Sequence, residues 1–144
     1  MSIKGKCLCG AVGYEISREK AEAGACHCGM CRAFSGGVYI AIQARAVEVT
    51  LSGREALSVH RSSAWAERAF CSKCGSAMFY RLTAGPSAGE FHLAAGALES
   101  WKGVDFIGEI FVDRKPGAYA FAGEHPRMTE AEFLASIGMT GAAS

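Results

Sequence analysis

The sequence lacks long apolar runs, linkers and internal repeats, and it has only 3 prolines among its 144 residues. Its longest apolar stretches, such as residues 37–42, are far too short to span a bilayer. The N-terminal residues 1–6 lack the apolar stretch of a secretory signal peptide. Because no linker or repeat divides the chain, we expect one domain over residues 1–144.

An excess of charge of one sign is also missing. The 15 Lys and Arg residues face 14 Asp and Glu residues, which leaves a formal charge of +1. This balance gives no electrostatic argument for a nucleic-acid partner or for membrane lipid, and neither is expected. The expected compartment is the cytoplasm, where a reducing environment disfavours disulfides. The chain does have 7 cysteines, and an odd number in such a compartment points first to metal binding.

Alternation of apolar and other residues with period two runs through most of the chain and predicts short strands. Val12, Tyr14 and Ile16 point one way, with glycine and glutamate between them. Similar runs lie at residues 38–42, 47–51, 56–60, 66–70, 77–82, 91–95 and 106–112. Strands at intervals of about ten residues, separated by Gly, Ser and Pro, are typical of a mainly β fold with antiparallel pairing.

One helix is predicted near the C-terminus. Thr129 and Glu132 form a capping-box pattern, apolar residues follow at helical spacing, and Gly138 ends the run. A shorter helical turn is predicted over residues 32–35. The last residues, 140–144, are expected to fray because nothing in the sequence ties them down.

The cysteines fall in three compact clusters. The clusters are Cys7 and Cys9, then Cys26, Cys28 and Cys31, then Cys71 and Cys74. Two thiolates from one turn and two from a distant turn are the usual way to build a closed tetrahedral zinc site, so the first and third clusters can form one structural site. Three ligands and an open fourth position are typical of catalytic zinc, which fits the middle cluster. A rival pairing joins Cys28 and Cys31 with Cys71 and Cys74, and spacing alone does not exclude it.

Three other uses of these cysteines stay open. Buried thiols that act as small apolar side chains explain scattered cysteines better than compact clusters. An iron–sulfur cluster is chemically compatible with the same thiolates. Both sites can also be purely structural, with His27 as a fourth ligand to the middle cluster. Against this, an extended segment turns the ring of His27 away from its neighbours Cys26 and Cys28.

The order of these residues resembles the glutathione-dependent formaldehyde-activating enzyme family, which also includes centromere-protein-V-like proteins. The motifs are Cys7-x-Cys9-Gly10, Cys26-His27-Cys28-x-x-Cys31-Arg32 and Phe70-Cys71-x-x-Cys74-Gly75. The resemblance covers about residues 5–121 and leaves 122–144 for the C-terminal helix and tail. The sequence departs from many members at Glu109, where they carry His, and at Tyr119, near which they carry Trp.

The resemblance implies a β-tent fold and one domain that holds two zinc ions. It places structural zinc on Cys7, Cys9, Cys71 and Cys74, and catalytic zinc on Cys26, Cys28 and Cys31. The implied activity joins glutathione to formaldehyde, which is a carbon–sulfur lyase reaction run in reverse on small-molecule substrates. The alternative is a non-catalytic zinc-binding module that binds a partner through its β surface.

Three further residues are candidates for the chemistry of the middle cluster. Arg32 is expected to offset thiolate charge or to bind a substrate carboxylate. His27 is expected to relay a proton. Glu109 is expected to face the open zinc site, with a merely buried carboxylate as the alternative. With seven thiolates and two zinc ions, the formal charge of the protein would change from +1 to −2.

Overall fold

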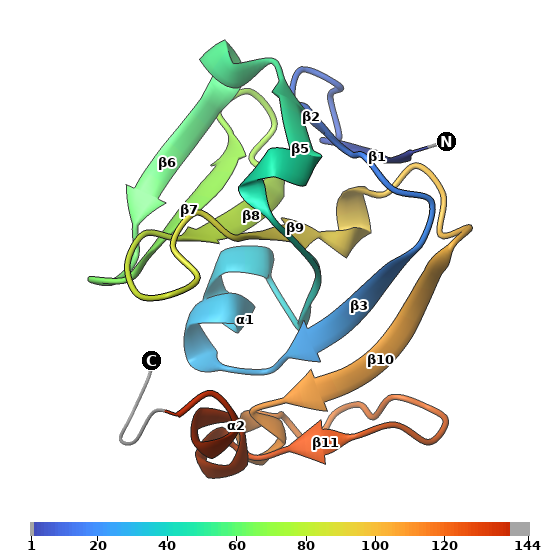
Figure 1. Cartoon of the computed structure of the whole chain (residues 1–144), viewed down its shortest axis with the longest axis vertical. Helices are drawn as coiled ribbons and strands as arrows, with labels where there is room; N and C mark the ends of the chain where they lie inside the picture. Colours follow the sequence, from blue (N-terminus) through green and yellow to red (C-terminus); the bar gives the residue numbers. More distant parts are fainter. Residues whose placement is uncertain (1, 139–144) are drawn as a thin grey trace.

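The structure is a computed structural model that describes residues 2–138, and within this range it is mainly β, as predicted. A three-stranded sheet has the order β1-β2-β5, and an eight-stranded sheet has the order β11-β10-β3-β4-β9-β8-β7-β6 (Figure 1). The strands are β1 (Ile3–Lys6), β2 (Gly13–Ile16), β3 (Ala21–Cys26), β4 (Tyr39–Ala44), β5 (Val49–Ser52), β6 (Leu57–Arg61), β7 (Ala66–Cys71), β8 (Ala77–Leu82), β9 (Phe91–Ala94), β10 (Val104–Ile110) and β11 (Arg127–Met128).

Two short α-helices accompany the sheets. They are α1 (Gly29–Ser35) and α2 (Glu130–Ser136), and 3-10 turns lie at η1 (Ala46–Glu48), η2 (Arg54–Ala56), η3 (Ala95–Ala97) and η4 (Val112–Arg114). The predicted capping box of α2 is present, since the Thr129 hydroxyl accepts from the Glu132 amide at 3.2 Å and the Glu132 carboxylate accepts from the Thr129 amide at 2.9 Å. Within residues 2–138, no helix is long and apolar enough to cross a membrane. The predicted fraying of residues 140–144 concerns residues outside the described range.

Helix α1 begins three residues before the predicted turn at 32–35, because a cysteine caps it. Cys28 is extended and occupies the N-cap position, where its sulfur accepts from the Cys31 amide at 3.4 Å. The helix ends at Gly36, whose left-handed backbone has φ 82°. A sulfur cap is not among the usual signals of a helix start, so the sequence pattern underestimates this helix.

Three strands, β1, β3 and β11, are absent from the predicted set, and β3 also breaks the expected antiparallel pairing. Strand β3 reads Ala-Glu-Ala-Gly-Ala-Cys, which has few of the β-branched and aromatic residues that mark strands. It pairs in parallel with β10, and β10 pairs in parallel with β11, whereas the other pairs are antiparallel. The parallel register places Ile110 beside Cys26, so β10 lies directly next to the middle cysteine cluster.

Successive residues of the eight-stranded sheet face two different cores, as the period-two pattern requires. On β4, Ile42 lies in the larger core and Tyr39 in the smaller one. On β8, Phe79 and Tyr80 divide in the same way. The larger core includes Cys7, Cys71 and the half-buried Cys74, and the smaller core includes Cys26, Cys28 and Cys31. The cysteines are therefore gathered on opposite faces of the same sheet.

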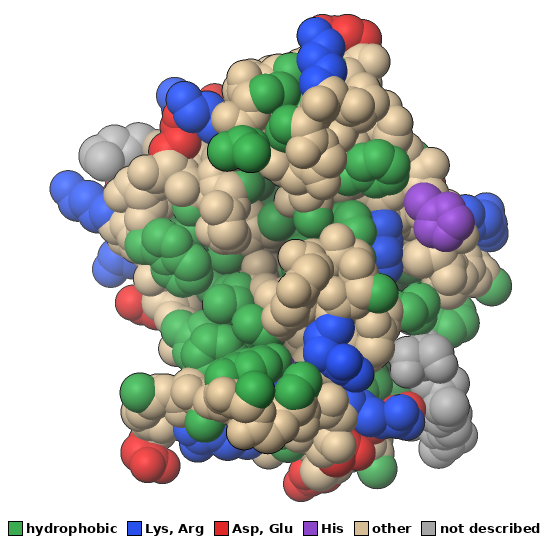
Figure 2. Space-filling view, turned by 180° about the vertical axis from the view of Figure 1, so that it is seen from behind, with side chains coloured by type: hydrophobic (Ala, Val, Ile, Leu, Met, Phe, Trp, Pro, Cys, Tyr) green, Lys and Arg blue, Asp and Glu red, His purple; other side chains and the backbone are tan. Residues whose placement is uncertain are grey.

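The surface carries charges of both signs. Figure 2 shows Lys and Arg side chains spread over one face of the molecule, interleaved with Asp, Glu and uncharged groups. Several large apolar side chains are exposed singly, of which Leu8 and Val47 are the most open. Single exposed apolar residues are ordinary on soluble domains. These surface features do not indicate a binding site, so the two cysteine clusters are the candidate functional sites.

Candidate metal centres

The first cluster brings together sulfurs from two distant turns. Cys7 and Cys9 lie in the turn between β1 and β2, and Cys71 and Cys74 lie at the turn between β7 and β8. The four sulfurs lie within 4.8 Å of one another. Cys9 is exposed and Cys74 is half-buried, so the cluster opens to solvent on one side. Because β1 and β7 belong to different sheets, this cluster links the two sheets of the fold.

Backbone amides and one hydroxyl surround the four sulfurs. The Val12 amide donates to Cys7 Sγ at 3.2 Å, and Ser76 Oγ lies 3.2 Å from Cys74 Sγ. The Leu8 amide in turn donates to Ser76 Oγ at 3.0 Å, which ties the two turns together. Hydrogen bonds from the Ser76 hydroxyl and amide lower the pKa of the Cys74 thiol to about 5. Such bonds favour the thiolate that metal binding requires.

The second cluster comes from one short segment. Cys26 ends β3, Cys28 caps α1, and Cys31 lies in the first turn of α1. Their sulfurs also lie within 4.8 Å of one another. The first and third clusters thus form the group of four and the middle cluster forms the group of three, as in the first predicted pairing and unlike its rival. Within residues 2–138, no fourth His, Cys, Asp or Glu joins this group.

The three-sulfur cluster is buried throughout. Cys26, Cys28 and Cys31 are 8%, 5% and 2% exposed, and they pack with Tyr39 and Phe111 in the smaller core. An open coordination position at this site would therefore follow from the number of protein ligands, which is three, and not from exposure of the sulfurs to solvent. Hydrogen bonds from Cys26 and Cys31 hold the pKa of the Cys28 thiol well below its ordinary value. The pKa values of the Cys26 and Cys31 thiols are raised, so Cys28 is the thiolate of the cluster before a soft metal ion such as zinc binds.

His27 lies between two of these cysteines but faces away from their sulfurs. It is fully buried, and both ring nitrogens have partners: Nε2 lies 2.7 Å from Glu109 Oε1 and Nδ1 lies 2.9 Å from the Tyr119 hydroxyl. The structure therefore does not place His27 as a fourth ligand, in agreement with the alternation expected of an extended segment. The ring holds the Cys26–Cys28 segment against β10 instead.

Glu109 joins a buried network and does not reach the sulfur cluster. Its Oε1 contacts His27, and its Oε2 lies 2.6 Å from His125 Nε2 and 3.0 Å from Arg127 Nε. Burial alone would raise the pKa of Glu109, but hydrogen bonds from His125 and His27 outweigh it and hold the pKa below its ordinary value. These contacts fit the buried-carboxylate alternative. Both positions that depart from the family pattern, Glu109 and Tyr119, thus contact His27.

The cation beside the three sulfurs is a different arginine from the one predicted. Arg32 Nε donates to the His27 carbonyl at 3.1 Å, so its guanidinium supports the backbone of the cysteine segment. Arg68, on β7, donates from Nη1 to Cys31 Sγ at 3.7 Å and is only 8% exposed. Because side chains alternate along a strand, residue 68 lies on the same face of β7 as the buried Ala66. An arginine at this inward-facing position was a sequence signal that the sequence analysis did not use.

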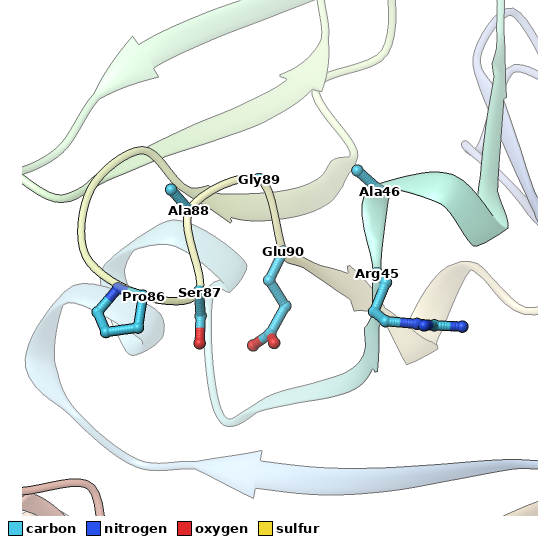
Figure 3. A pocket seen from close by; sticks show the side chains of 7 residues that line it. All are labelled: Arg45, Ala46, Pro86, Ser87, Ala88, Gly89 and Glu90. Carbon is cyan, nitrogen blue, oxygen red and sulfur yellow. The ribbon is translucent and has the colours of Figure 1, made fainter.

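A surface hollow lies apart from both clusters. Residues of η1 and of the loop before β9 line it, and the oxygens of Ser87 and Glu90 point the same way while the Arg45 guanidinium points aside (Figure 3). Glu90 Oε1 lies 3.1 Å from Nε2 of His92, whose ring stacks on Tyr80 at 4.2 Å. The hollow therefore reaches the smaller core only through these side chains.

The mainly β fold and its two compact thiol clusters define a class of small proteins suited to hold metal ions through sulfur. The chain belongs to the glutathione-dependent formaldehyde-activating enzyme family, whose sequence model matches residues 2–114. The predicted resemblance is thereby confirmed. Arg68 and both cysteine clusters lie within the matched residues, whereas Tyr119, His125 and Arg127 lie beyond them.

Relatives of known name agree with this membership. A Schizosaccharomyces pombe protein named as an uncharacterized lyase is 28% identical over 134 residues, which cover 93% of this chain and 96% of the relative. A Halomonas elongata protein named "Putative glutathione-dependent formaldehyde-activating enzyme" is 32% identical over 87 residues, or 55% of each chain. A crystal structure of a Rhodobacter sphaeroides protein has a TM-score of 0.55 and 27% identity, and the match covers 86% of this chain and 98% of that one. The family and the relatives' names support an enzyme of the lyase type.

Proposed function

We propose that the protein is a zinc-dependent carbon–sulfur lyase-like enzyme that acts on the glutathione adduct of a small electrophile such as formaldehyde. The observation that carries the proposal is a set of three buried sulfurs within 4.8 Å of one another, with no fourth metal-ligating residue beside them within residues 2–138. Three protein ligands leave one position for a substrate atom. The lyase-type family membership supports the same reaction class.

Each cluster fits one zinc ion because thiolates are soft donors that zinc accepts in sets of three or four. Zinc at Cys26, Cys28 and Cys31 would supply Lewis acidity toward a carbonyl oxygen or a thiol. Zinc at Cys7, Cys9, Cys71 and Cys74 would be structural. The free thiols suit the reducing cytoplasm, which we propose as the compartment, and the two sites together would belong to one zinc-binding domain over residues 1–144.

The residues around the three sulfurs would orient the reaction and exclude water. Burial of the cluster removes competing solvent and strengthens each electrostatic contact. His27, held by Glu109 and Tyr119, fixes the segment that carries Cys26 and Cys28. Arg32 supports the same segment through the His27 carbonyl. We assign His27 and Arg32 to positioning, because both ring nitrogens of His27 and Nε of Arg32 have protein partners.

The reaction is balanced without a further reagent. A carbon–sulfur bond forms between the formaldehyde carbon and the glutathione sulfur, and the thiol proton ends on the former carbonyl oxygen. Adduct formation is measured by NMR with isotope-labelled formaldehyde and glutathione, with and without protein. We expect faster formation with the wild-type protein and only the uncatalysed rate with the Cys28→Ser variant. A Lys73→Ala variant, altered at an exposed position near Cys74, is the matched control.

A second function, that of a non-catalytic zinc-binding interaction module, is favoured by one observation. All three sulfurs of the middle cluster are at most 8% exposed, which suits a structural site as well as a catalytic one. The same experiment separates the two functions. Wild-type protein that carries two zinc ions yet leaves adduct formation at the uncatalysed rate would favour the interaction module.

A further inference from the structure

We propose that Arg68 forms an anion-binding position beside the three-sulfur cluster, and that this position accepts the thiolate of a thiol substrate. The inference rests on the proposed function, and it adds the group that recognises the substrate sulfur. Arg68 lies on β7 and contacts Cys31, which belongs to the smaller core.

Arg68 is a buried cation that has no carboxylate partner among residues 2–138 and has the sulfur of Cys31 beside it. Its side chain is 8% exposed, and among residues 2–138 it forms no ion pair with a carboxylate. Nη1 donates to Cys31 Sγ at 3.7 Å, while Nε is buried and has no hydrogen-bond partner. A buried guanidinium with an unused donor is costly unless an anion compensates it. The free donor therefore lacks an acceptor that a bound anion would supply.

Aromatic rings hold this guanidinium in place. The carbon at its centre lies 5.3 Å from the ring centroid of Phe34 and 5.0 Å from that of Tyr80. Arg68 and Tyr80 are direct partners across β7 and β8, and Tyr80 is itself stacked on His92. Cation–π contacts of this kind stabilise the charge without using its N–H donors. The donors stay available for a ligand in a fixed direction.

The charge of the cluster explains why a cation is needed there. Three thiolates around a divalent ion carry a net charge of −1, and this charge repels an incoming thiolate. Arg68 neutralises it, so that a substrate thiol can lose its proton to solvent and enter as an anion. A thioether of the same shape cannot become an anion and gains nothing from Arg68. The inference thus predicts discrimination between a thiol and its S-methyl derivative.

The test compares binding of glutathione and S-methylglutathione to the zinc-loaded protein by calorimetry. Wild-type protein should bind glutathione more tightly than S-methylglutathione. Arg68→Met should weaken glutathione binding by about tenfold or more, as expected for loss of a hydrogen bond to a charged group, and leave S-methylglutathione nearly unchanged. Arg68→Lys keeps the charge and should retain much of the preference. Zinc per chain and circular dichroism are measured on each variant.

The outcomes separate the two proposals. Wild-type protein without any preference for the thiol would overturn the proposed thiol chemistry and this inference with it. A wild-type preference that persists in a folded Arg68→Met variant with two zinc ions would overturn the role of Arg68 alone. If Arg68→Met does not fold, Arg68→Gln removes the charge while it keeps a polar side chain, and the same comparison decides.

Discussion

The two cysteine clusters differ in burial, in connectivity and in the charges around them. The four-sulfur cluster reaches the surface at Cys9, so that water can solvate its negative charge. The three-sulfur cluster is buried and has Arg68 against Cys31. The first joins the β1–β2 turn to the β7–β8 turn across two sheets, whereas the second lies within residues 26–31. From this difference we expect that the cluster more open to solvent stabilises the fold, and that the buried one is a local site whose change leaves the fold intact.

The largest effect should follow from breaking the cluster that joins the sheets. Cys71→Ser removes a fully buried ligand from the four-sulfur cluster. Structural zinc sites supply on the order of 10 kcal/mol of folding free energy, which exceeds the stability margin of many small domains. We expect an unfolded or aggregated protein by circular dichroism. Lys73→Ala, in the same turn, should fold like the wild type, and a folded Cys71→Ser protein would contradict the assignment.

The next effect separates function from fold. Cys28→Ser removes one thiol from the three-sulfur cluster, while serine, a favoured N-cap residue, keeps the cap of α1. Because this cluster joins no distant segments, the cost in unfolding free energy should be about 1–3 kcal/mol. We expect a protein that is folded by circular dichroism and has no activity in the adduct assay. If this variant unfolds as fully as Cys71→Ser, the two clusters do not differ in role.

A partial loss of stability should come from a change in the network behind His27. Glu109→Gln removes the charge that accepts from His27, His125 and Arg127. Loss of charged hydrogen bonds at a buried site should lower the unfolding free energy by about 2–4 kcal/mol, measured by urea denaturation. Tyr119→Phe, which removes one contact to His27, is the milder control. If the Glu109→Gln variant releases zinc equally from both clusters, the network around Glu109 does not support the three-sulfur cluster specifically.

The smallest effect concerns pH. Burial, with a smaller contribution from Arg68, lowers the pKa of His92 from 6.5 to about 4 against the opposing effect of Glu90. Between these values the unfolded chain binds a proton that the folded chain does not, so stability falls by ~1–3 kcal/mol as the pH drops from 6.5 to 4. His92→Phe keeps a ring against Tyr80 and should remove this part of the pH dependence in urea denaturation. An unchanged dependence would show that His92 is not buried in its neutral form.

Much of the fold was predictable because its signals are local. The alternation that predicts residues 77–82 corresponds to β8, and the capping box at Thr129 begins α2. Strand β3 was not predictable, since alanine and glycine give it weak strand character and the parallel partner β10 lies about eighty residues away. A long-range partner of this kind leaves no mark in a short window of sequence.

Ligand number favoured the observed cysteine grouping without excluding its rival, and the family resemblance implied it, but the surroundings of the clusters were not predictable. Three thiols in six residues indicate a local site regardless of the fold. The contact between Arg68 and Cys31 depends on how β7 packs against α1, and the partners of Glu109 come from residues that follow it by 16 and 18 positions. These contacts form only when the sheet and the C-terminal segment are assembled.

The proposed difference in role between the two clusters requires that each cluster hold one metal ion in the folded protein. Native mass spectrometry of the wild type and of Cys28→Ser, prepared side by side, measures zinc per chain and compactness together. We predict two zinc ions in the wild type, one in Cys28→Ser, and the compact charge-state distribution of a folded protein for both. One zinc ion in each protein would contradict a metal site at the three-sulfur cluster, and with it the difference between the two clusters.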